Sequence, residues 1–336
     1  MKLLIKYFCI FISIFFFEAC TKEIDFTDLV SRPQLVVHSY ITPGETINVK
    51  VTLSRLLTDS SYVFKVVNNA DVLVYVNGEF IEKLETVSFS YNEGRYRSSH
   101  KPAINDIVKI VVKAPSMHEV SAETYFTQPT TILSVDTTRA RDYGTIIEID
   151  EGDTTAVNSD YQLKFALTFK DDAAQANFYR LIVYTKYSEI NKYLSEYRTT
   201  TEYFGCEFTD KIAGIKSTPN PITEEFEINS AETNRYNVFN DDMINGKTYS
   251  LNFITNRLIL RKNYPKYNEN NQTIKIEIFV SLQSINKEFY NYLISRDASF
   301  NTDFFSEPVQ IKSNIKGGIG FFGSYTSSNI VKVEIK

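Results

Sequence analysis

Hydrophobic and polar residues alternate through much of the chain, and this alternation predicts a protein built mainly from β-strands. In Ile47–Arg55, aliphatic residues occupy every second position and polar residues lie between them. The same period of two places four large apolar residues on one face of Tyr161–Lys170. A strand with this pattern buries one face in a core and leaves the other face in water.

The first third of the chain predicts a small sandwich. Asn77-Gly78 separates two apolar runs within Ala70–Leu84, and Asn-Gly is the strongest short signal for a β-hairpin. Further strands are predicted at Gln34–Thr42, Ile47–Arg55, Asp106–Ala114 and Val120–Thr127. Short strands at this spacing are typical of an immunoglobulin-like β-sandwich, which we therefore assign to residues 33–129.

Residues 130–336 are predicted to form a second β-rich domain that carries a short helix. Strands are expected at Tyr161–Lys170, Asn177–Ser188, Lys247–Thr255, Thr273–Gln283 and Ile330–Ile335. The helix is expected near residues 285–298, because Ile285, Phe289 and Leu293 share one helical face and Ser284 is suited to cap it. The glycine-rich stretch 317–323 is expected to be a turn before the last strand.

The amino-terminal residues have the order of an export signal. Two lysines precede an apolar run that reaches Phe17, and Ala19-Cys20 follows it. The run is much shorter than the ~20 residues that a membrane-spanning helix needs. We interpret residues 1–19 as a signal peptide and Cys20 as a site of lipidation, as in bacterial lipoproteins. The alternative is an ordinary signal peptide in which Cys20 is incidental.

The rest of the composition agrees with an exported, anchored protein. Residues 20–32 are polar and without periodicity, so we interpret them as a lipidated tether. If Cys20 carries lipid and Cys9 leaves with the signal, Cys206 has no disulfide partner within the chain. The formal charge of −5 and the lack of a basic patch argue against nucleic-acid binding. We expect an outer-membrane location, with a lipid anchor and a body facing the cell exterior.

Motifs that carry catalysis or bind metal are scarce in the sequence. The chain has three histidines, His38, His100 and His118, and no HExxH, paired CxxC or GxSxG motif. Asp241-Asp242 is more readily explained by a turn or helix cap than by a calcium loop. We therefore predict no catalytic residues, no metal site and no cofactor, and expect that the protein is not an enzyme.

Aromatic residues provide the candidate binding surface. The chain has 22 Tyr and 25 Phe, and its tyrosines interleave with charged residues between positions 184 and 204. Amphipathic rings on a polar segment suit the binding of a peptide, a glycan or a partner protein. The candidate residues are Tyr187, Tyr193, Tyr197 and Tyr203. The alternative is a meander or short helix whose rings pack inward.

Several segments carry a resemblance to a known family. They are Leu35–His38, Phe239–Asp242, Gly246–Tyr249, Ser284–Leu293, Glu307–Val309 and Ser313–Gly323. With the lipoprotein start, they resemble a Bacteroidetes family of outer-membrane lipoproteins that is described only as a domain of unknown function. Members are commonly encoded near TonB-dependent receptors, so the resemblance implies nutrient uptake. It brings no catalytic residues with it.

Three functional hypotheses follow from these observations. The first is a non-enzymatic, surface-anchored lipoprotein that assists a TonB-dependent outer-membrane receptor in nutrient uptake. The second is an adhesion or surface-assembly module, because sandwich domains on a tether could hold a surface structure. The third is a surface hydrolase, which requires a pocket that joins a histidine to an acid and a nucleophile.

Overall fold

The protein is mainly β, as the alternation predicts, and its strands form sandwiches. The computed structural model describes residues 33–55, 63–87, 94–150, 153–191, 196–210, 234–261, 272–300 and 309–333. The predicted signal peptide, the tether and Cys20 lie outside these residues. Within them, helical residues are confined to one short element, which is neither long nor apolar enough to cross a membrane.

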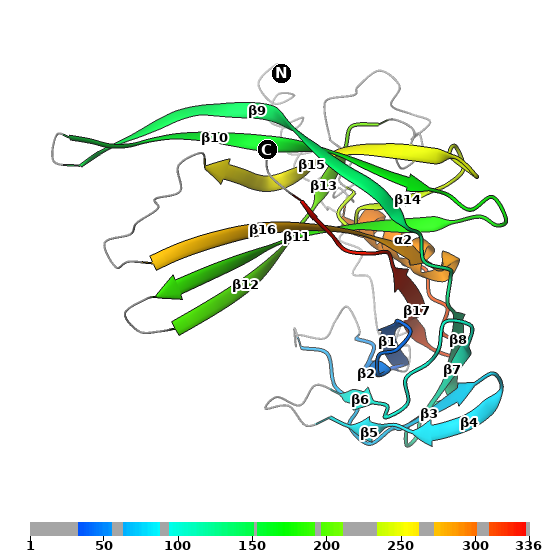
Figure 1. Cartoon of the computed structure of the whole chain (residues 1–336). Coiled ribbons are helices and arrows are strands. Elements are labelled where there is room, and N and C mark those ends of the chain that lie inside the picture. The colour runs from blue at the N-terminus through cyan, green and yellow to red at the C-terminus, as the bar shows by residue number, and fades with distance from the viewer. Residues whose placement is uncertain are drawn as a thin grey trace, which may run out of the picture.

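The amino-terminal part is a sandwich of short strands (Figure 1). One layer contains β1 (Leu35–Ile41), β2 (Asn48–Leu53), β6 (Arg95–Arg97) and β5 (Glu85–Thr86). The other contains β4 (Glu79–Lys83), β3 (Asp71–Val76), β7 (Ile107–Lys113) and β8 (Val120–Tyr125). Asn77 and Gly78 both have positive φ in the β3–β4 turn, which confirms the predicted hairpin. Alternate aliphatic residues of both layers, such as Val37 and Val74, form the core.

The second part packs two further layers of longer strands around an aromatic core. One layer contains β9 (Ile132–Asp150), β10 (Asp153–Lys170), β15 (Thr248–Arg261) and β13 (Cys206–Phe208). The facing layer contains β11 (Phe178–Asn191), β12 (Glu196–Phe204), β14 (Val238–Asn240), β16 (Gln272–Ile285) and β18 (Val331–Val333). Phe165 and Phe253 stack between the layers with ring centroids 5.0 Å apart. The long strands extend to the left of Figure 1.

The strand β17 (Ile319–Ser327) joins the two parts into one continuous sheet. It pairs in parallel with β1 and antiparallel with β16. The order β12-β11-β16-β17-β1-β2-β6-β5 results among the described strands. Phe322 of β17 is fully buried in the amino-terminal core, although it lies far outside residues 33–129.

Two expectations near the carboxyl end are corrected by the structure. The stretch 317–323 is not only a turn, because residues 319–323 belong to β17, where glycine lets two backbones approach closely. The helix α2 (Lys287–Phe300) forms near the predicted position. Ser284 and Ile285, however, are the last residues of β16 and do not begin the helix. The cap is Asn286, whose side-chain Oδ1 accepts a hydrogen bond from the Phe289 amide at 3.1 Å.

Candidate functional site

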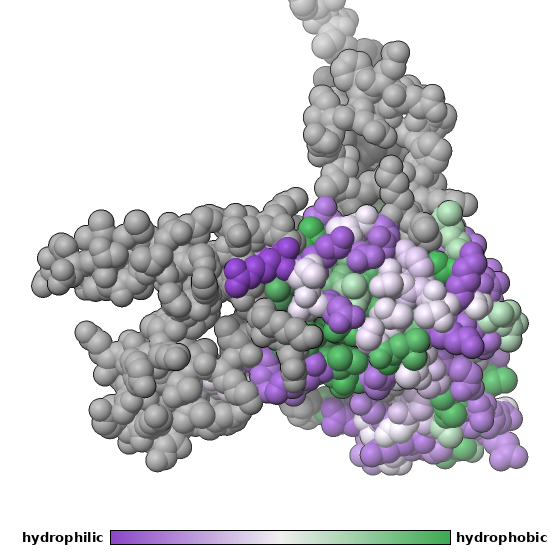
Figure 2. Space-filling model, turned by 45° about the horizontal axis from the view of Figure 1, so that its top comes forward, coloured by the Kyte–Doolittle hydropathy of each residue, from purple (hydrophilic) through white to green (hydrophobic). Residues whose placement is uncertain are grey.

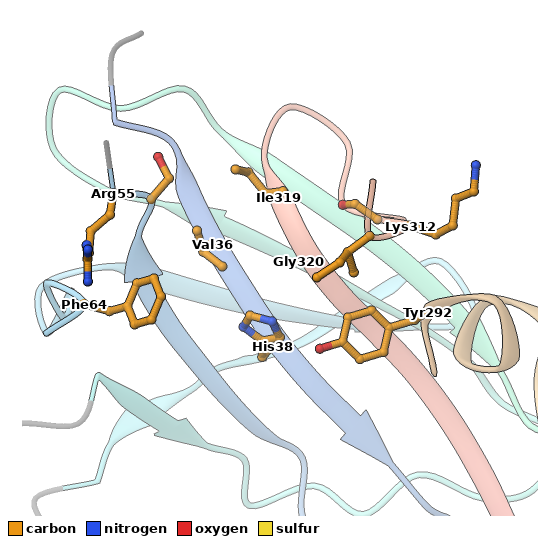
Figure 3. Close-up of a pocket in the computed structure, with 11 residues that line it drawn as sticks. Val36, His38, Arg55, Phe64, Tyr292, Lys312, Ile319 and Gly320 are labelled. Carbon is orange, nitrogen blue, oxygen red and sulfur yellow. The ribbon is translucent and has the colours of Figure 1, made fainter. Parts of the chain in front are cut away.

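An open groove of about 490 Å³ lies on the outer face of the sheet beside α2 (Figure 3). Its lining comes from β1, the segment after β2, α2, β17 and the segment that leads into β17. The lining residues are Val36, His38, Ser54, Arg55, Phe64, Tyr292, Ile311, Lys312, Ser313, Ile319 and Gly320. The volume lies within the range of small-ligand sites.

The floor of the groove is formed by two paired strands. Val36 of β1 lies directly opposite Ile319 of β17, and both side chains are partly or fully accessible. Two residues further along each strand, His38 lies opposite Phe321, which α2 covers. The groove is therefore the part of this sheet face that remains open where the cover by α2 ends.

Tyr292 of α2 forms one wall and is held on three sides. Its ring stacks on Phe321 at 4.5 Å between centroids, with 11° between the ring planes. The ring of His38, which lies on β1, meets the Tyr292 ring edge-on with 6.3 Å between the ring centroids (Figure 3). Arg296 donates a hydrogen bond from Nη1 to the Tyr292 hydroxyl at 3.3 Å. These contacts fix the orientation of the wall before any ligand arrives.

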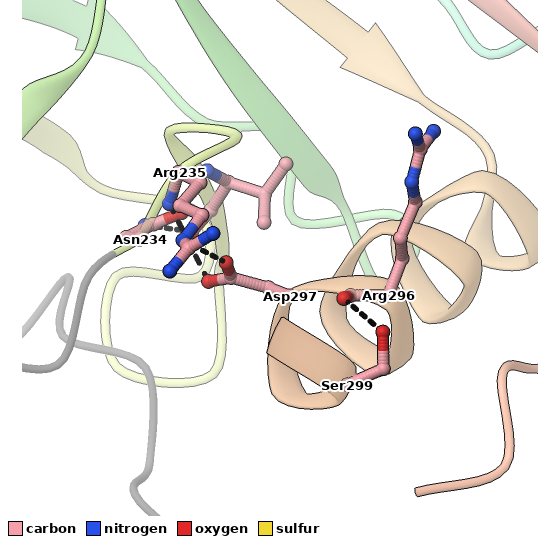
Figure 4. Close-up of polar contacts among 6 residues, drawn as sticks. Asn234, Arg235, Arg296, Asp297 and Ser299 are labelled. Carbon is pink, nitrogen blue, oxygen red and sulfur yellow. Dashed lines mark hydrogen bonds and ion pairs between the residues drawn. The ribbon is translucent and has the colours of Figure 1, made fainter. Parts of the chain in front are cut away.

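Arg296 and its neighbour on α2 leave the helix in different directions (Figure 4). Asp297 accepts a hydrogen bond from the Arg235 amide at 3.4 Å, and its Oδ1 lies 3.7 Å from Arg235 Nε. This contact ties the carboxyl half of α2 to the segment before β14. Asp297 therefore pairs with Arg235 and does not bring its charge to the groove lining.

The segment that carries Ile311–Ser313 is fixed by hydrogen bonds at both ends. The Lys312 amide donates to Ser295 Oγ of α2 at 2.8 Å. Asn314 forms two bonds with the Phe322 backbone: its Oδ1 accepts from the amide at 2.9 Å, and its Nδ2 donates to the carbonyl at 2.6 Å. An asparagine thus acts as a strand partner for β17 and sets the position of Lys312 beside the groove.

The opposite wall is formed by Arg55 and Phe64. The Arg55 guanidinium lies 5.8 Å from the centre of the Phe64 ring, within cation–π distance. Ser54 is fixed to the edge of β1, because its amide donates to the Gln34 carbonyl and its Oγ accepts from the Gln34 amide, both at 2.9 Å. In Figure 3, Arg55 and Lys312 lie on opposite sides of the floor.

The charges around the groove are positive. Arg55 and Lys312 line it as cations, together with His38, and the described lining residues include no Asp or Glu. Burial lowers the pKa of His38 below its ordinary value, and the positive charges of Arg296 and Lys50 lower it further. His38 lines the groove from β1.

The predicted tyrosine surface lies on a β-hairpin, so the segment is not the short helix that was one of the alternatives considered from the sequence. Tyr187 lies on β11 opposite Thr200, and Tyr197 lies on β12 opposite Ile190. Tyr193 lies outside the described residues. Tyr203 is 70% exposed and is the candidate whose side chain the structure describes. Alternating Thr, Tyr and Phe in this segment suit a pleated strand better than a helix.

Tyr203 belongs to an aromatic row across three strands. Its ring centroid lies 5.5 Å from that of Tyr184 on β11, which stacks on Phe279 of β16 at 5.1 Å. Lys186 lies 5.1 Å above the Phe279 ring. The structure therefore adds Tyr184 and Phe279, which sequence reasoning did not select. None of the predicted tyrosines that the structure describes lines the groove of β1 and β17.

The acidic residues near Gly246 have a structural explanation. Asp241 is buried, and its Oδ2 accepts hydrogen bonds from the Asn177 amide at 2.8 Å and from Asn177 Nδ2 at 3.2 Å. Asp171 accepts from the Tyr179 hydroxyl at 2.5 Å and from the Gly246 amide at 2.7 Å. These carboxylates hold turns together. Over the described part of the chain, no three His, Cys, Asp or Glu residues cluster as metal ligands.

The groove was not predicted because its residues are far apart in the sequence. Positions 36, 38, 54, 55, 64, 292, 311–313, 319 and 320 meet only when β17 pairs with β1. A signal was nevertheless present, because three segments that carry the family resemblance, Leu35–His38, Ser284–Leu293 and Ser313–Gly323, all contribute to the lining. On the described face in Figure 2, hydrophobic residues form patches among hydrophilic ones, so hydropathy alone does not mark the site.

Comparison with known proteins gives a family match. A family model described as a domain of unknown function (DUF4249) matches residues 21–330. No curated protein matches the chain. Among solved structures, the partial N-terminal region of an enterococcal surface protein is similar over 88% of this chain and 93% of that one, at 8% identity. Its TM-score of 0.15 is too low to support any argument from the likeness.

Proposed function

The chain belongs to the DUF4249 family, a domain of unknown function, and from this premise we propose a role in nutrient uptake. In this proposal it is a lipid-anchored outer-membrane protein with its body facing the cell exterior. It binds a nutrient without catalysing a reaction and assists a TonB-dependent receptor in taking that nutrient up. The lipid is carried by Cys20, and residues 20–32 form the tether.

The observation that carries the proposal is the groove beside α2. It combines an accessible apolar floor with cationic walls and lies on a sheet that β17 makes continuous. Concave sites with apolar walls and a few placed polar groups are the usual form of small-ligand sites. A binding role uses these features directly, because a ligand can be held by the walls and released to a partner.

The export signal and the family resemblance support the cellular setting. The pattern that ends at Cys20 favours a lipid anchor, and the resembled family is commonly encoded near TonB-dependent receptors. The row of Phe279, Tyr184 and Tyr203, which are half-buried except for the exposed Tyr203, offers a separate surface for contact with a receptor. Exposed tyrosines are enriched at protein interfaces, because a ring provides contact area and a hydroxyl provides a hydrogen bond.

Affinity capture tests the partner claim. The epitope-tagged full chain is extracted with detergent from its native cells, and the captured proteins are identified by mass spectrometry. We expect enrichment of a TonB-dependent receptor. The matched control is Cys20→Ser, which we expect to lose both labelled palmitate and the receptor. If wild-type protein enriches no such receptor, or incorporates no palmitate, the proposal is wrong.

A further inference from the structure

We propose that the groove formed by β1, β17 and α2 binds a small amphipathic carboxylate, in which an apolar ring or chain carries the acid group. The apolar body would lie on Val36 and Ile319, and the carboxylate would be bound by Arg55 or Lys312. This inference deepens the proposed function, on which it rests, because it names the chemical class of the nutrient.

The floor and walls are suited to an apolar body. Val36, Ile319 and Ile311 offer aliphatic surface, while Phe64 and Tyr292 offer rings on opposite sides. Ile311 and Ile319 are 42% and 39% exposed, so both are open to a ligand. Covering this surface removes apolar area from water and favours binding by about 25 cal/mol per Å² before the costs of association.

The charges select an anion. Arg55 and Lys312 provide two permanent positive charges on opposite sides of the floor, and the lining has no acid among its described residues. Lys50 and Arg296 lie close enough to act on His38, so the positive field extends beyond the lining itself. A carboxylate fits the planar donors of Arg55 and the ammonium of Lys312. A cation would meet repulsion from every charged lining residue.

The same residues argue against a neutral sugar as the ligand. A sugar presents several hydroxyl groups, and each one that leaves water needs a hydrogen-bond partner. The lining offers the side-chain hydroxyls of Ser54, Ser313 and Tyr292, and all three already accept a hydrogen bond from another group of the chain. The groove is thus better matched to one anionic group on a large apolar body than to many hydroxyls.

The wall on the α2 side is fixed before a ligand binds. Tyr292 is held by Phe321, His38 and Arg296, and the segment of Lys312 is held by Ser295. A preformed site loses little conformational entropy when a ligand enters, so it can bind a small molecule usefully. This rigidity distinguishes the groove from a surface depression formed by flexible side chains.

Fluorescence provides the test. The chain contains no Trp, so the emission of a naphthalene probe can be followed without a tryptophan background. The full mature chain is titrated with 2-naphthoate and, separately, with neutral 2-naphthalenemethanol, which has the same ring system. We expect saturable binding of the acid, and at least about tenfold weaker binding of the alcohol. Equal affinity for the two probes would overturn the assignment of an anion.

Variants show whether the probe occupies the groove. Ile319→Glu places a negative charge on the floor, and we expect it to weaken 2-naphthoate at least about tenfold. Ile319→Gln has a similar shape without the charge, so we expect a much smaller loss. The double variant Arg55→Gln/Lys312→Gln should weaken binding to a similar degree as Ile319→Glu. Lys170→Gln, on β10 outside the lining, should bind like the wild type.

The outcomes separate this inference from the proposed function. Thermal unfolding of each variant confirms that the variant is folded. We expect the fold to tolerate the substitutions at Ile319, because this side chain is partly exposed. If folded Ile319→Glu binds 2-naphthoate like the wild type, the groove assignment is wrong even when the receptor is still captured. If the probe binds as expected but no receptor is enriched, the uptake role alone is wrong.

Discussion

An ideal Cβ built on Gly320 would lie 2.0 Å from the carbonyl oxygen of Val37. Gly320 also has a φ of +118°, a conformation that L side chains rarely adopt. The two residues are register partners in the parallel pair of β17 and β1. The close approach of these strands therefore requires glycine. The pair of strands β1 and β17 joins the two parts of the molecule and forms the floor of the groove.

Replacing Gly320 by alanine should destabilise the protein strongly. The new methyl group collides with backbone that cannot move aside without breaking the sheet, and the φ value adds strain. We expect Gly320→Ala to lower the free energy of unfolding by about 3 kcal/mol, measured by urea denaturation.

Gly78→Ala is the matched control for this prediction. Gly78 has a φ of +88°, but a Cβ there meets no atom within 4 Å. It should therefore show only the cost of the backbone conformation, about 1 to 2 kcal/mol. If Gly320→Ala is no less stable than Gly78→Ala, the close approach of β17 and β1 is not as described.

Asn286 connects the cap of α2 to the amino-terminal sandwich. It is fully buried, and its Nδ2 donates to Thr124 Oγ1 on β8 at 2.8 Å while its Oδ1 caps the helix. We expect Asn286→Ala to cost about 2 to 3 kcal/mol and Thr124→Val about 1 to 2 kcal/mol in unfolding free energy. The double variant should cost less than the sum by about 1 kcal/mol, because both changes remove one shared bond. Strict additivity would contradict this contact.

Asp241 should make stability depend on pH. Burial raises its pKa above the ordinary value, and the charge of Asp171 raises it further, while hydrogen bonds from Asn177 act in the opposite direction. The folded chain thus holds this proton more tightly than the unfolded chain. The associated stability is present below the ordinary aspartate pKa and is lost as pH rises through the raised value.

Asp241→Asn provides the measurement. The substitution keeps the single oxygen that Asn177 contacts, but it cannot ionise. From about pH 4 upward, the unfolding free energy of wild type should fall relative to that of the variant. Asp242→Asn, an exposed neighbour, should keep the wild-type profile. Parallel profiles for wild type and Asp241→Asn would contradict the raised pKa.

His38 should give the groove a pH-dependent affinity. Because its pKa lies below the ordinary value, the imidazole is neutral at pH 7 and becomes a third cation of the lining in mild acid. Lys50 and Arg296 are the neighbouring cations that act on His38, and Arg55 and Lys312 are the other basic residues of the lining. We expect the affinity for 2-naphthoate to stay level between about pH 8 and about pH 7 and to rise only as pH falls below the ordinary histidine pKa of about 6.5. His38→Gln should remove this rise, and an equal rise in the variant would exclude His38 as its source.

The sequence predicted the local structure well where one short-range signal decides it. Asn77-Gly78 specifies its hairpin through positive φ values, and the alternation in Ile47–Arg55 specifies a half-buried strand. The helical face of Phe289 and Leu293 specifies α2, with a start two or three residues later than the capping pattern of Ser284 suggested. In each case the deciding contacts are close in sequence.

Features that depend on distant contacts were not predicted. Gly317–Gly323 has the composition of a turn, and only the neighbouring Val37 backbone makes part of it a strand. The groove requires residues from both ends of the chain, so no local pattern marks His38 or Tyr292 as neighbours. The tyrosines between 184 and 204 were selected for their chemistry, yet their places on a hairpin depend on pairing with β16.

The position of β1 between β2 and β17 has a mechanical consequence. A pull transmitted along the strand through the residues before Leu35 acts on hydrogen-bonded ladders on both of its sides. Such a load shears many bonds together instead of opening them one after another from an edge. A body tethered at this strand would thus resist drag from flowing medium. The resistance would come in part from the pairing of β1 with β17, the same contact that depends on Gly320 and makes the sheet continuous.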